Sequence, residues 1–288
     1  MIQITCRNEK FLSIVSKIPL IKYLFVVKIF RIHEIIQAKN LDNTFRFFLV
    51  DNNISKQTTI DRFAEIDDVA INYLNFGSSN IIHDIGVSNG LTSLSFYRKL
   101  TNKKINFQFF ISDKFSKIFY EGKFVTKIYD VNGNLLIAYL FNLVASKAKY
   151  FLLSNFLYFI IRKFYPRQKS KDKSVLLFSN ELIPLLENGE INYIDYDVSK
   201  TKLTNKFTFV RCMNVLNLSY FSESQIKTAL ANILDLLIDN GILQIGRTAQ
   251  SNINHVSFYK KSNGKFVLLE NVNEGTELKK IIQYILLK

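Results

Sequence analysis

Four residues whose types suit ligand binding occupy alternate positions of this chain, where an apolar segment is followed by a helical one. They are Asp84, Gly86, Ser88 and Gly90, inside the segment IIHDIGVSNGLTSLSFYRKL of residues 81–100. Glycine allows left-handed backbone conformations and lets a ligand approach the main chain closely. A helix that begins just after such a loop presents unpaired N–H groups and partial positive charge. The segment therefore predicts a strand, a glycine-bearing loop and a helix N-terminus that bind a nucleotide.

The spacing of these residues separates two kinds of nucleotide site. The dinucleotide fingerprint is G-x-G-x-x-G, whereas this loop reads D-x-G-x-S-x-G, with an acid ahead of the first glycine. That pattern resembles the first motif of the class I S-adenosylmethionine-dependent methyltransferases, D/E-x-G-x-G-x-G, with Ser88 in place of the middle glycine. The resemblance implies S-adenosyl-L-methionine as the cofactor and the four loop residues as part of its site. The alternative is a structural left-handed turn in another doubly wound sheet.

Two more acidic residues accompany later strands. Asp113 follows the apolar strand expected over residues 106–111, and Asp197 ends the strand expected over residues 191–198. In the methyltransferases that this chain resembles, an acid at the first place accepts hydrogen bonds from both ribose hydroxyls. An acid or amide near the second place contacts the adenine amino group. A carboxylate can accept two donors at once in charge-assisted hydrogen bonds, although either residue could instead cap a turn or a helix.

The stretch of residues 207–247 carries a second set of motifs. It predicts a strand, a loop, a helix that begins with the capping box Ser222-x-x-Gln225, and another strand. Its letters RCMNVL, followed by Tyr-Phe, resemble the C-R-N-V-L-x-Y-F motif of the chemotaxis-receptor methyltransferases. Thr208 stands where the wider family usually has the Asp of its F-D-x-I pattern, and Asn240 replaces one glycine of a usual pair. Because of these two departures, the resemblance does not by itself imply the catalytic activity of the family.

Polar residues of this stretch are candidates for the rest of the site. The resemblance places Asn214 at the cofactor. It places Asn217, Tyr220 and Arg247 on loops at the carboxyl edge of the fourth and fifth strands, where they would orient the substrate. Each of them could equally cap a turn or lie in solvent. No decisive base stands out, because His83 in the first strand is expected to be a core histidine, and the catalytic residues stay unassigned.

The order of these motifs predicts an α/β fold over residues 77–288. It is expected to be a Rossmann-like, seven-stranded, mostly parallel sheet with helices on both faces. A hairpin about Asn263-Gly264 should close it, because the family that this chain resembles has its last strand antiparallel to the others. Residues 1–76 are expected to form an N-terminal helical cap, whose last helix, over residues 61–76, leads into the first strand.

A hairpin-plus-helix insertion over residues 121–173 departs from the family's pattern. Asn132-Gly133 predicts a hairpin within residues 123–141. Residues 143–165 predict an apolar, aromatic helix bordered by Lys and Arg, which would suit an interface with anionic lipid. A substrate-pocket wall or a core helix explains the same stripe. The segment 143–173 is therefore a candidate for peripheral contact with an anionic membrane.

Composition narrows the classes of partner. The chain has 288 residues, 48% of them hydrophobic, which suits a large core. Its net charge of +14 suits an anionic partner or substrate. The alternative is that the charge reflects AT-rich coding, because Lys, Asn, Ile and Phe are abundant together and like charges occur only in short runs. No nucleic-acid motif is evident. Cys6, Cys212 and the three histidines lack metal-ligand spacing, so no metal is expected. Because no apolar run approaches the roughly 20 residues of a membrane-spanning helix, a cytoplasmic location is expected, with membrane association as a second option.

Together these features predict a methyltransferase that uses S-adenosyl-L-methionine and acts on an unidentified acceptor. A small molecule, a lipid or a cell-envelope intermediate would suit the apolar insertion. A protein carboxylate is suggested by the receptor-methyltransferase resemblance. The alternative from another class is a non-catalytic, methyltransferase-like binding protein. The sequence identifies neither the acceptor nor an oligomeric state.

Overall fold

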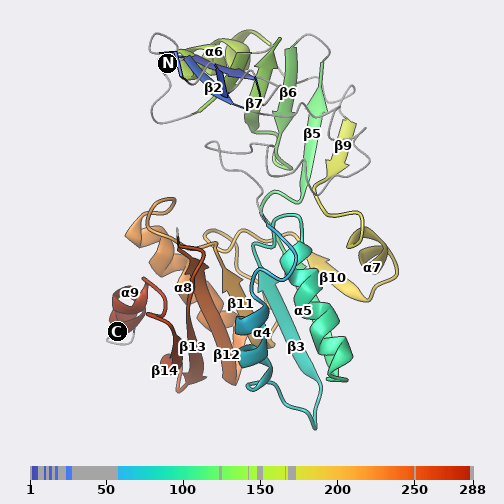
Figure 1. Ribbon diagram of the computed structural model, residues 1–288, viewed down its shortest axis with the longest axis vertical. Helices are drawn as coiled ribbons and strands as arrows, with labels where there is room; N and C mark the ends of the chain where they lie inside the picture. Colours follow the sequence, from blue (N-terminus) through green and yellow to red (C-terminus); the bar gives the residue numbers. More distant parts are fainter. Residues whose placement is uncertain are drawn as a thin grey trace. The chain divides into compact units, whose positions relative to one another are not determined.

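The chain divides into two compact units, each with its own sheet. The computed structural model describes residues 2–5, 10, 13–14, 17–18, 24–27 and 58–285, the last range without 123–124, 142, 148–151, 166, 168–172 and 250. Unit 1 comprises residues 1–58 and 115–180, and unit 2 comprises residues 59–114 and 181–288. Unit 1 is therefore assembled from the N-terminal region and the expected insertion, while the segments between and after them form unit 2 (Figure 1).

Unit 2 is built on a sheet with the strand order β10-β4-β3-β11-β12-β13-β14. The strands are β3 (Asn80–Ile85), β4 (Phe107–Ser112), β10 (Ile191–Ile194), β11 (Phe207–Met213), β12 (Leu237–Thr248), β13 (Asn254–Ser262) and β14 (Lys265–Val272). Neighbouring strands from β10 through β4, β3 and β11 to β12 pair in parallel, and β13 pairs antiparallel with both of its neighbours, β12 and β14. Only β13 of this sheet therefore runs against the others.

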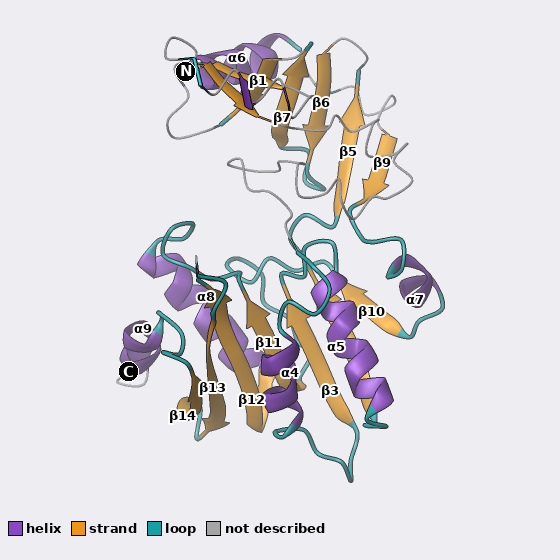
Figure 2. Ribbon diagram, viewed as in Figure 1, coloured by secondary structure: helices purple, strands orange, loops and turns teal. Residues whose placement is uncertain are grey.

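Helices cover both faces of this sheet (Figure 2). They are α4 (Ala64–Ile71), α5 (Leu91–Asn102), α8 (Glu223–Leu236) and α9 (Lys279–Ile285), and the short α7 (Ile183–Glu187) precedes β10. Successive side chains of a strand point to opposite faces. In β11, Phe209 contacts Phe96 of α5, with 6.2 Å between ring centroids, whereas Val210 and Cys212 pack with the apolar face of α8. The expected α/β, Rossmann-like sheet with helices on both faces is thus confirmed.

The last hairpin places its strands differently from the expectation. Asn263 and Gly264 have φ values of 51° and 73°, and they join β13 to β14 in register. Two-residue hairpin turns of this kind join only adjacent strands. The last strand, β14, therefore lies at the sheet edge and runs with the parallel set, and β13 is the antiparallel strand.

Helix α8 begins as its sequence predicts. The side chain of Ser222 accepts a hydrogen bond from the backbone N–H of Gln225, and the Gln225 side chain accepts one from the Ser222 N–H, at 2.9 Å. This capping box satisfies N–H groups that a helix start leaves unpaired. Ile226, Leu230 and Ile233 follow at helical spacing and are fully buried, which fixes α8 on the sheet beside β11 and β12.

Unit 1 contains a second sheet, with the order β2-β1-β8-β7-β6-β5-β9. Its elements are β1 (Ile2–Thr5), β2 (Leu24–Val27), β5 (Lys117–Glu121), β6 (Val125–Tyr129), β7 (Leu135–Leu140), β8 (Leu143–Ser146), β9 (Lys173–Leu176) and helix α6 (Leu152–Phe164). Strands β1 and β2 pair in parallel, and the other pairs are antiparallel. The hairpin predicted at Asn132-Gly133 is confirmed as β6 and β7.

Two expectations for unit 1 need correction. In the N-terminal region, residues 2–5 and 24–27 form strands rather than a helical cap, because β1 pairs with β8, where Ile4 faces Leu143. Most of the remaining expected helical segment before residue 58 lies outside the described residues. Residues 143–146 form β8 instead of the start of a helix, since they pair with β7, and α6 begins only at Leu152.

The predicted helix of residues 61–76 is present as the shorter α4, and it belongs to unit 2. Residues 173–176 form β9, which pairs with β5 in the sheet of unit 1. Among the helices that the structure describes, none combines the length and the apolar character needed to cross a bilayer.

Candidate functional site

The carboxyl ends of β3 and β11 meet at the centre of the unit 2 sheet. From β3 the chain crosses to β4 on one side, whereas β11 is followed by β12 on the other side. Open α/β sheets bind ligands outside the carboxyl ends of their strands, at such a switch point. The loop of residues 86–90 after β3 and the loop of residues 214–221 after β11 border this place.

The conformation of the loop after β3 depends on three residues with left-handed backbone and on hydrogen bonds to the end of β4. Gly86, Ser88 and Gly90 have φ values of 72°, 60° and 84°. The N–H groups of Gly86 and Val87 donate to the carbonyl of Ser112, at 2.7 and 3.1 Å. Left-handed backbone is costly for residues other than glycine, so Ser88 needs support from its surroundings.

That support comes from Asp113. Its Oδ2 accepts a hydrogen bond of 2.7 Å from the backbone N–H of Ser88, and the residue is mostly buried. Its own carbonyl accepts from the hydroxyl of Tyr193, at 3.3 Å. The structure therefore brings together two of the predicted site residues, one from the loop after β3 and one from the tip of β4.

The two glycines of the loop are also required by the protein's own packing. A Cβ atom at Gly86 would lie 2.2 Å from a methyl group of Val215, and one at Gly90 would lie 2.2 Å from a methyl group of Leu182. Val215 belongs to the Asn-Val-Leu motif after β11. The motif's apolar residue thus packs directly on the glycine loop, and the two predicted motifs are neighbours in space.

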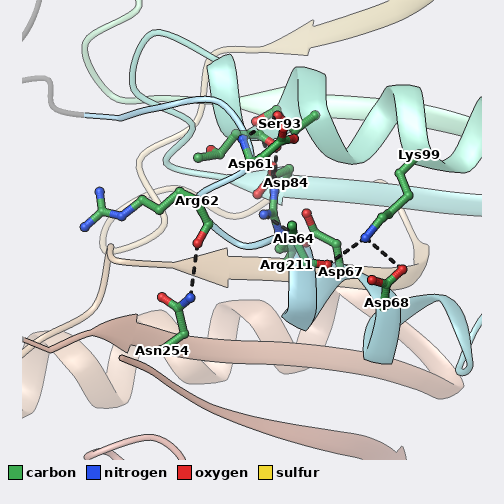
Figure 3. A network of polar contacts seen from close by, with 12 residues as sticks. Asp61, Arg62, Ala64, Asp67, Asp68, Asp84, Ser93, Lys99, Arg211 and Asn254 are labelled. Atoms are coloured by element: carbon green, nitrogen blue, oxygen red, sulfur yellow. Dashed lines mark hydrogen bonds and ion pairs between the residues drawn. The ribbon is translucent and has the colours of Figure 1, made fainter. Parts of the chain in front are cut away.

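Asp84 lies in a buried ion cluster next to this loop (Figure 3). Its Oδ2 accepts hydrogen bonds from Ser93 Oγ of α5 and from Arg211 Nη1 of β11, each at 2.7 Å. The other terminal nitrogen of Arg211, Nη2, lies 3.1 Å from Oδ1 of Asp67 on α4. One guanidinium is thus shared by two carboxylates, and Asp84 ties β3 to β11 and α5. A contact from Asp84 to a cofactor stays a prediction.

Aromatic rings and burial set the electrostatics of this cluster. The guanidinium carbon of Arg211 lies 5.0 and 5.1 Å from the ring centroids of Phe63 and Phe96, which suits cation–π contacts. Burial raises the pKa of Asp67 to about 7; Arg211 opposes this shift and Asp84 adds to it. The contact with Asp67 has ion-pair distance but not hydrogen-bond alignment. Asp67 is therefore the carboxyl whose pKa burial brings near neutral pH.

The sequence interpretation missed the partnership of Asp67 with Arg211. A signal was present in both elements. Asp67 interrupts an apolar helical stripe beside Ile66 and Ala70, and Arg211 interrupts the apolar strand FTFVRCM. Charged residues are rarely fully buried unless they are paired. Two opposite charges at core positions therefore favour a pair, but the sequence alone does not say which residues meet.

Asn214 fastens the end of β11 to the end of β12. Its Oδ1 accepts from the Thr248 N–H at 2.7 Å, and its Nδ2 donates to Thr248 Oγ1 at 3.2 Å. Thr248 Oγ1 donates to Asn254 Oδ1 at 2.8 Å. The side chain of Asn254 in turn donates to the Arg62 carbonyl at 3.1 Å (Figure 3). Asn214 thus lies at the carboxyl edge as expected, and its contact with a cofactor stays a prediction.

Two other candidates stabilise turns. Strand β10 ends at Ile194, earlier than expected, and Asp197 follows it. The Asp197 Oδ1 accepts from the N–H and hydroxyl of Ser199, at 3.0 and 2.6 Å. The Asn217 Oδ1 accepts from the N–H groups of Ser219 and Tyr220, at 2.8 and 3.2 Å. The turn-capping alternative therefore describes the contacts of both residues, and an adenine or substrate contact stays a prediction.

Arg247 and Tyr220 lie on the same edge of the sheet. Arg247 Nη1 forms an ion pair of 2.9 Å with Oε2 of Glu277. Oε1 of the same Glu277 accepts from the N–H of Leu218, at 3.4 Å. Glu277 therefore links the end of β12 to the loop after β11, where the side chain of Tyr220 is exposed. These residues stay candidates for substrate contact.

His83 is a core histidine, as expected. Its ring is fully buried and lies 4.6 Å from the ring of Phe207. Its Nε2 lies 2.9 Å from Ser112 Oγ. Burial lowers the pKa of His83 to about 3, so the imidazole is neutral near pH 7.

The fold of unit 2 is identified by the strand order of its sheet and by the loop after β3. Unit 2 has the Rossmann-like fold of class I methyltransferases, with a rearranged last hairpin. No protein-family model matches the sequence, and no curated protein matches it. The fold assignment therefore rests on the topology of the sheet itself.

Solved structures of methyltransferases are similar to the chain at low identity. A Methanococcus maripaludis protein, provisionally described as S-adenosyl-L-methionine-dependent, is 14% identical, with a TM-score of 0.33 over 65% of this chain. This chain spans only about half, 55%, of that protein. An S-adenosylmethionine-dependent methyltransferase from Clostridium acetobutylicum is 10% identical, with a TM-score of 0.34 over 80% of both chains. The N-methyltransferase NodS from Bradyrhizobium japonicum is 12% identical, with a TM-score of 0.34 over 70% of this chain and 69% of its own.

The residues at the carboxyl edge fit a nucleoside cofactor in two respects. Asp113 offers a carboxylate at the tip of the second strand, where charge-assisted hydrogen bonds to hydroxyl groups can form. Within the described loop, the Nδ2 of the fully buried Asn89 has no hydrogen-bond partner. Unpaired buried donors are rare, so each asks for an explanation such as a water molecule or a ligand.

Proposed function

We propose that the chain is a methyltransferase that binds S-adenosyl-L-methionine at the carboxyl edge of the unit 2 sheet. The observation that carries the proposal is the hydrogen bond between the Ser88 N–H and the Asp113 carboxylate. It joins the glycine loop after β3 to the acid at the end of β4, at the switch point of an open α/β sheet. Two motifs read separately from the sequence thus converge on one place.

The chain's own residues would act mainly by positioning. Asp113 would accept the ribose hydroxyls while it holds Ser88 in its left-handed conformation. Gly86 and Gly90 keep the loop backbone close to the helix start, where N–H groups favour polar ligand atoms. When bound, S-adenosyl-L-methionine supplies an electrophilic methyl group to an acceptor. Correct placement of two reacting groups provides much of the catalysis in such a transfer, and Asn217, Tyr220 and Arg247 are the candidates to place the acceptor.

The test is calorimetric titration with S-adenosyl-L-methionine and with its demethylated product. We expect micromolar binding by the parent protein and at least tenfold weaker binding by Asp113→Ala, since a charge-assisted hydrogen bond contributes about 1.5–3 kcal/mol. The matched control is Asp235→Ala, which removes an exposed carboxylate of α8 and should bind as the parent does. Absence of binding by the folded parent would contradict the proposal.

A second variant separates ligand binding from loop support. In Asp113→Asn the amide oxygen can still accept the Ser88 N–H, whereas the negative charge is lost. We expect this variant to lose less thermal stability than Asp113→Ala, because the Ser88 N–H keeps an acceptor, while its affinity for the cofactor falls. Equal affinity in the parent and in both Asp113 variants would remove this residue from the site.

One observation favours the non-catalytic alternative. Asp84, the acid of the first motif, is buried with Arg211 and Ser93, and Val215 packs on Gly86. The first motif therefore has a structural role that would persist without catalysis. Incubation with methyl-labelled cofactor and cell-extract fractions distinguishes the two functions. Label in a protein, lipid or small-molecule fraction supports the enzyme and identifies the acceptor class, whereas cofactor binding without transfer supports the binding protein.

A further inference from the structure

Nearly all of the net charge of the chain lies in unit 1. This unit holds 20 of the 38 Lys and Arg residues but only 7 of the 24 Asp and Glu residues, which gives it a net charge of +13. Unit 2, with 18 basic and 17 acidic residues, has a net charge of +1. The two units hold similar numbers of basic residues, so the difference arises mainly from the small number of acidic residues in unit 1. The asymmetry therefore points to an anionic partner of unit 1.

Helix α6 lies on the sheet of unit 1 with one face. It packs against β8, with further contacts to β1 and β7. The Ser154 hydroxyl donates to the Val144 carbonyl at 2.8 Å, and the Tyr158 hydroxyl donates to the Leu135 carbonyl at 2.6 Å. Ile161 is buried in the same row. These contacts fix which side of α6 faces the sheet.

The opposite side of α6 is apolar and exposed. Leu152, Phe156 and Phe159 follow at helical spacing, and their exposed fractions are 82%, 60% and 55%. Because residues i, i+4 and i+7 share one face of a helix, these three side chains form a row away from the buried row. Arg162 and Lys163 lie in the last turn and are also exposed. The helix contains no acidic residue.

We propose that this exposed row of α6, together with Arg162 and Lys163, binds the surface of an anionic lipid bilayer. Contiguous exposed apolar side chains mark interaction sites, and an amphipathic helix with basic residues inserts its apolar face at the boundary between headgroups and acyl chains. The helix has 13 residues, so it is about 20 Å long. That length is shorter than the hydrocarbon core of about 30 Å, so α6 lies in the plane of the interface.

The apolar row decides between a bilayer and a nucleic acid. Basic residues alone would suit either of these anionic partners. Nucleic acids bind aromatic side chains by stacking with bases, but they offer no apolar phase to an aliphatic side chain such as Leu152, the most exposed of the row. A bilayer accepts both the aliphatic and the aromatic members of the row.

The experiment is flotation of the full chain with vesicles. One set contains phosphatidylcholine alone, and the other contains equal parts of phosphatidylcholine and phosphatidylglycerol. We expect binding to the anionic set at low salt and its loss at about 0.5 M salt, where electrostatic attraction is screened. Lack of binding to the anionic vesicles at low salt, or equal binding to both sets, would overturn the proposal.

Matched variants locate the surface. Phe156→Gln with Phe159→Gln should weaken vesicle binding more than tenfold, since each variant position loses an aromatic side chain that would be buried among the acyl chains. Phe76→Gln is the control, because Phe76 of unit 2 is 62% exposed. Arg162→Gln with Lys163→Gln should weaken binding about fivefold per charge. Lys103→Gln with Lys104→Gln, in unit 2, removes the same charge and should change binding little.

All of these positions are exposed, so the variants are expected to keep the parent's melting temperature. Wild-type binding by the Phe156 and Phe159 variant would overturn the assignment to α6. Binding of the chain to a single-stranded homopolymer, without binding to the anionic vesicles, would identify a nucleic acid as the partner instead of a bilayer. No measurement here uses the cofactor, so failure of the methyltransferase proposal and failure of the membrane proposal are separate results.

Discussion

Buried ion clusters occur in both units, and their charge balance differs. In unit 1, Lys127 Nζ lies 2.6 Å from Oε1 of Glu121, and the Tyr129 hydroxyl donates to the same oxygen at 2.8 Å. Among the described residues, this ion pair joins one acid to one base. In unit 2, Arg211 faces two acids, Asp84 and Asp67. The second cluster therefore carries one excess negative charge when all its groups are ionised.

The two clusters also differ in how the chain assembles them. Glu121 and Lys127 are register partners on the neighbouring strands β5 and β6, so a hairpin brings them together. Lys127 also donates to the Tyr165 carbonyl beyond the end of α6, at 3.1 Å. Arg211 and Asp84 are 127 residues apart and meet only after the parallel sheet has formed. The comparison teaches that a hairpin can join one acid to one base, while two acids from consecutive elements share a single base that comes from a strand far along the chain.

Breaking the Arg211 cluster should have the largest effect. In Arg211→Met both buried carboxylates lose their partner, so we expect the free energy of unfolding to fall by about 3–5 kcal/mol or the protein not to fold. Urea denaturation measures this change. Arg98→Met is the control, because Arg98 and Glu181 form an exposed pair that should contribute at most about 1 kcal/mol. Equal losses in the two variants would contradict the structural importance of the cluster.

Breaking the Glu121–Lys127 ion pair should lower the free energy of unfolding strongly, but it should affect the structure of unit 1 alone. Lys127→Met leaves Glu121 buried without its cation, and we expect a loss of about 3 kcal/mol. Hydrogen exchange should increase in β5, β6 and α6 and stay unchanged in β3 and β11. Lys173→Met, at an exposed position of β9, is the matched control. Faster exchange throughout both units would show that the cluster does not act locally.

The excess acid of unit 2 should appear in the pH dependence of stability. The pKa of Asp67 is raised from 3.8 to about 7 by burial, so its contribution is present below about pH 4 and is lost as pH rises toward 7. His83 acts in the opposite direction. Its pKa is lowered from 6.5 to about 3 by burial, so its contribution is present above pH 6.5 and is lost as pH falls.

The variant Asp67→Asn separates these two opposed contributions. Without the Asp67 carboxyl, the free energy of unfolding should rise from about pH 4 to 6.5, because only the His83 contribution remains of the two. The parent should show a flatter curve over this range. Denaturation with urea across a pH series measures both curves. Identical slopes in parent and variant would place the pKa of Asp67 outside this window.

The smallest effect is expected at Tyr129. Tyr129→Phe removes the hydroxyl that donates to Glu121 but keeps the ring and the Lys127 partner. We expect a loss of about 1 kcal/mol in the free energy of unfolding, as for one hydrogen bond. Tyr220→Phe, at an exposed side chain, should change nothing measurable. A loss above about 3 kcal/mol in Tyr129→Phe would mean that the hydroxyl, rather than Lys127, provides most of the stabilisation of the buried Glu121 carboxylate.

Several local elements of this protein could be predicted from its sequence. Turn and cap signals act over a few residues, so Asn132-Gly133, Asn263-Gly264 and the capping box at Ser222 correctly indicated where hairpins and a helix begin. The glycine loop after β3 was predicted for the same reason, because its left-handed positions need glycine or local support. The mostly parallel sheet was expected from the order of the motifs that resemble class I methyltransferases.

Contacts between segments far apart in the chain depend on the tertiary structure. Residues 2–5 and 143–146 were expected in helices, but they form strands β1 and β8, because each pairs with a strand distant in sequence or in the neighbouring hairpin. Arg211 and Asp67 were readable as unusual charges, but their pairing depends on strand order and on how α4 lies on the sheet. The same holds at the site, where the Ser88 N–H reaches Asp113 only because β3 and β4 are neighbours. Local conformational preference is encoded in adjacent residues, whereas these contacts depend on packing between elements that are far apart in the chain.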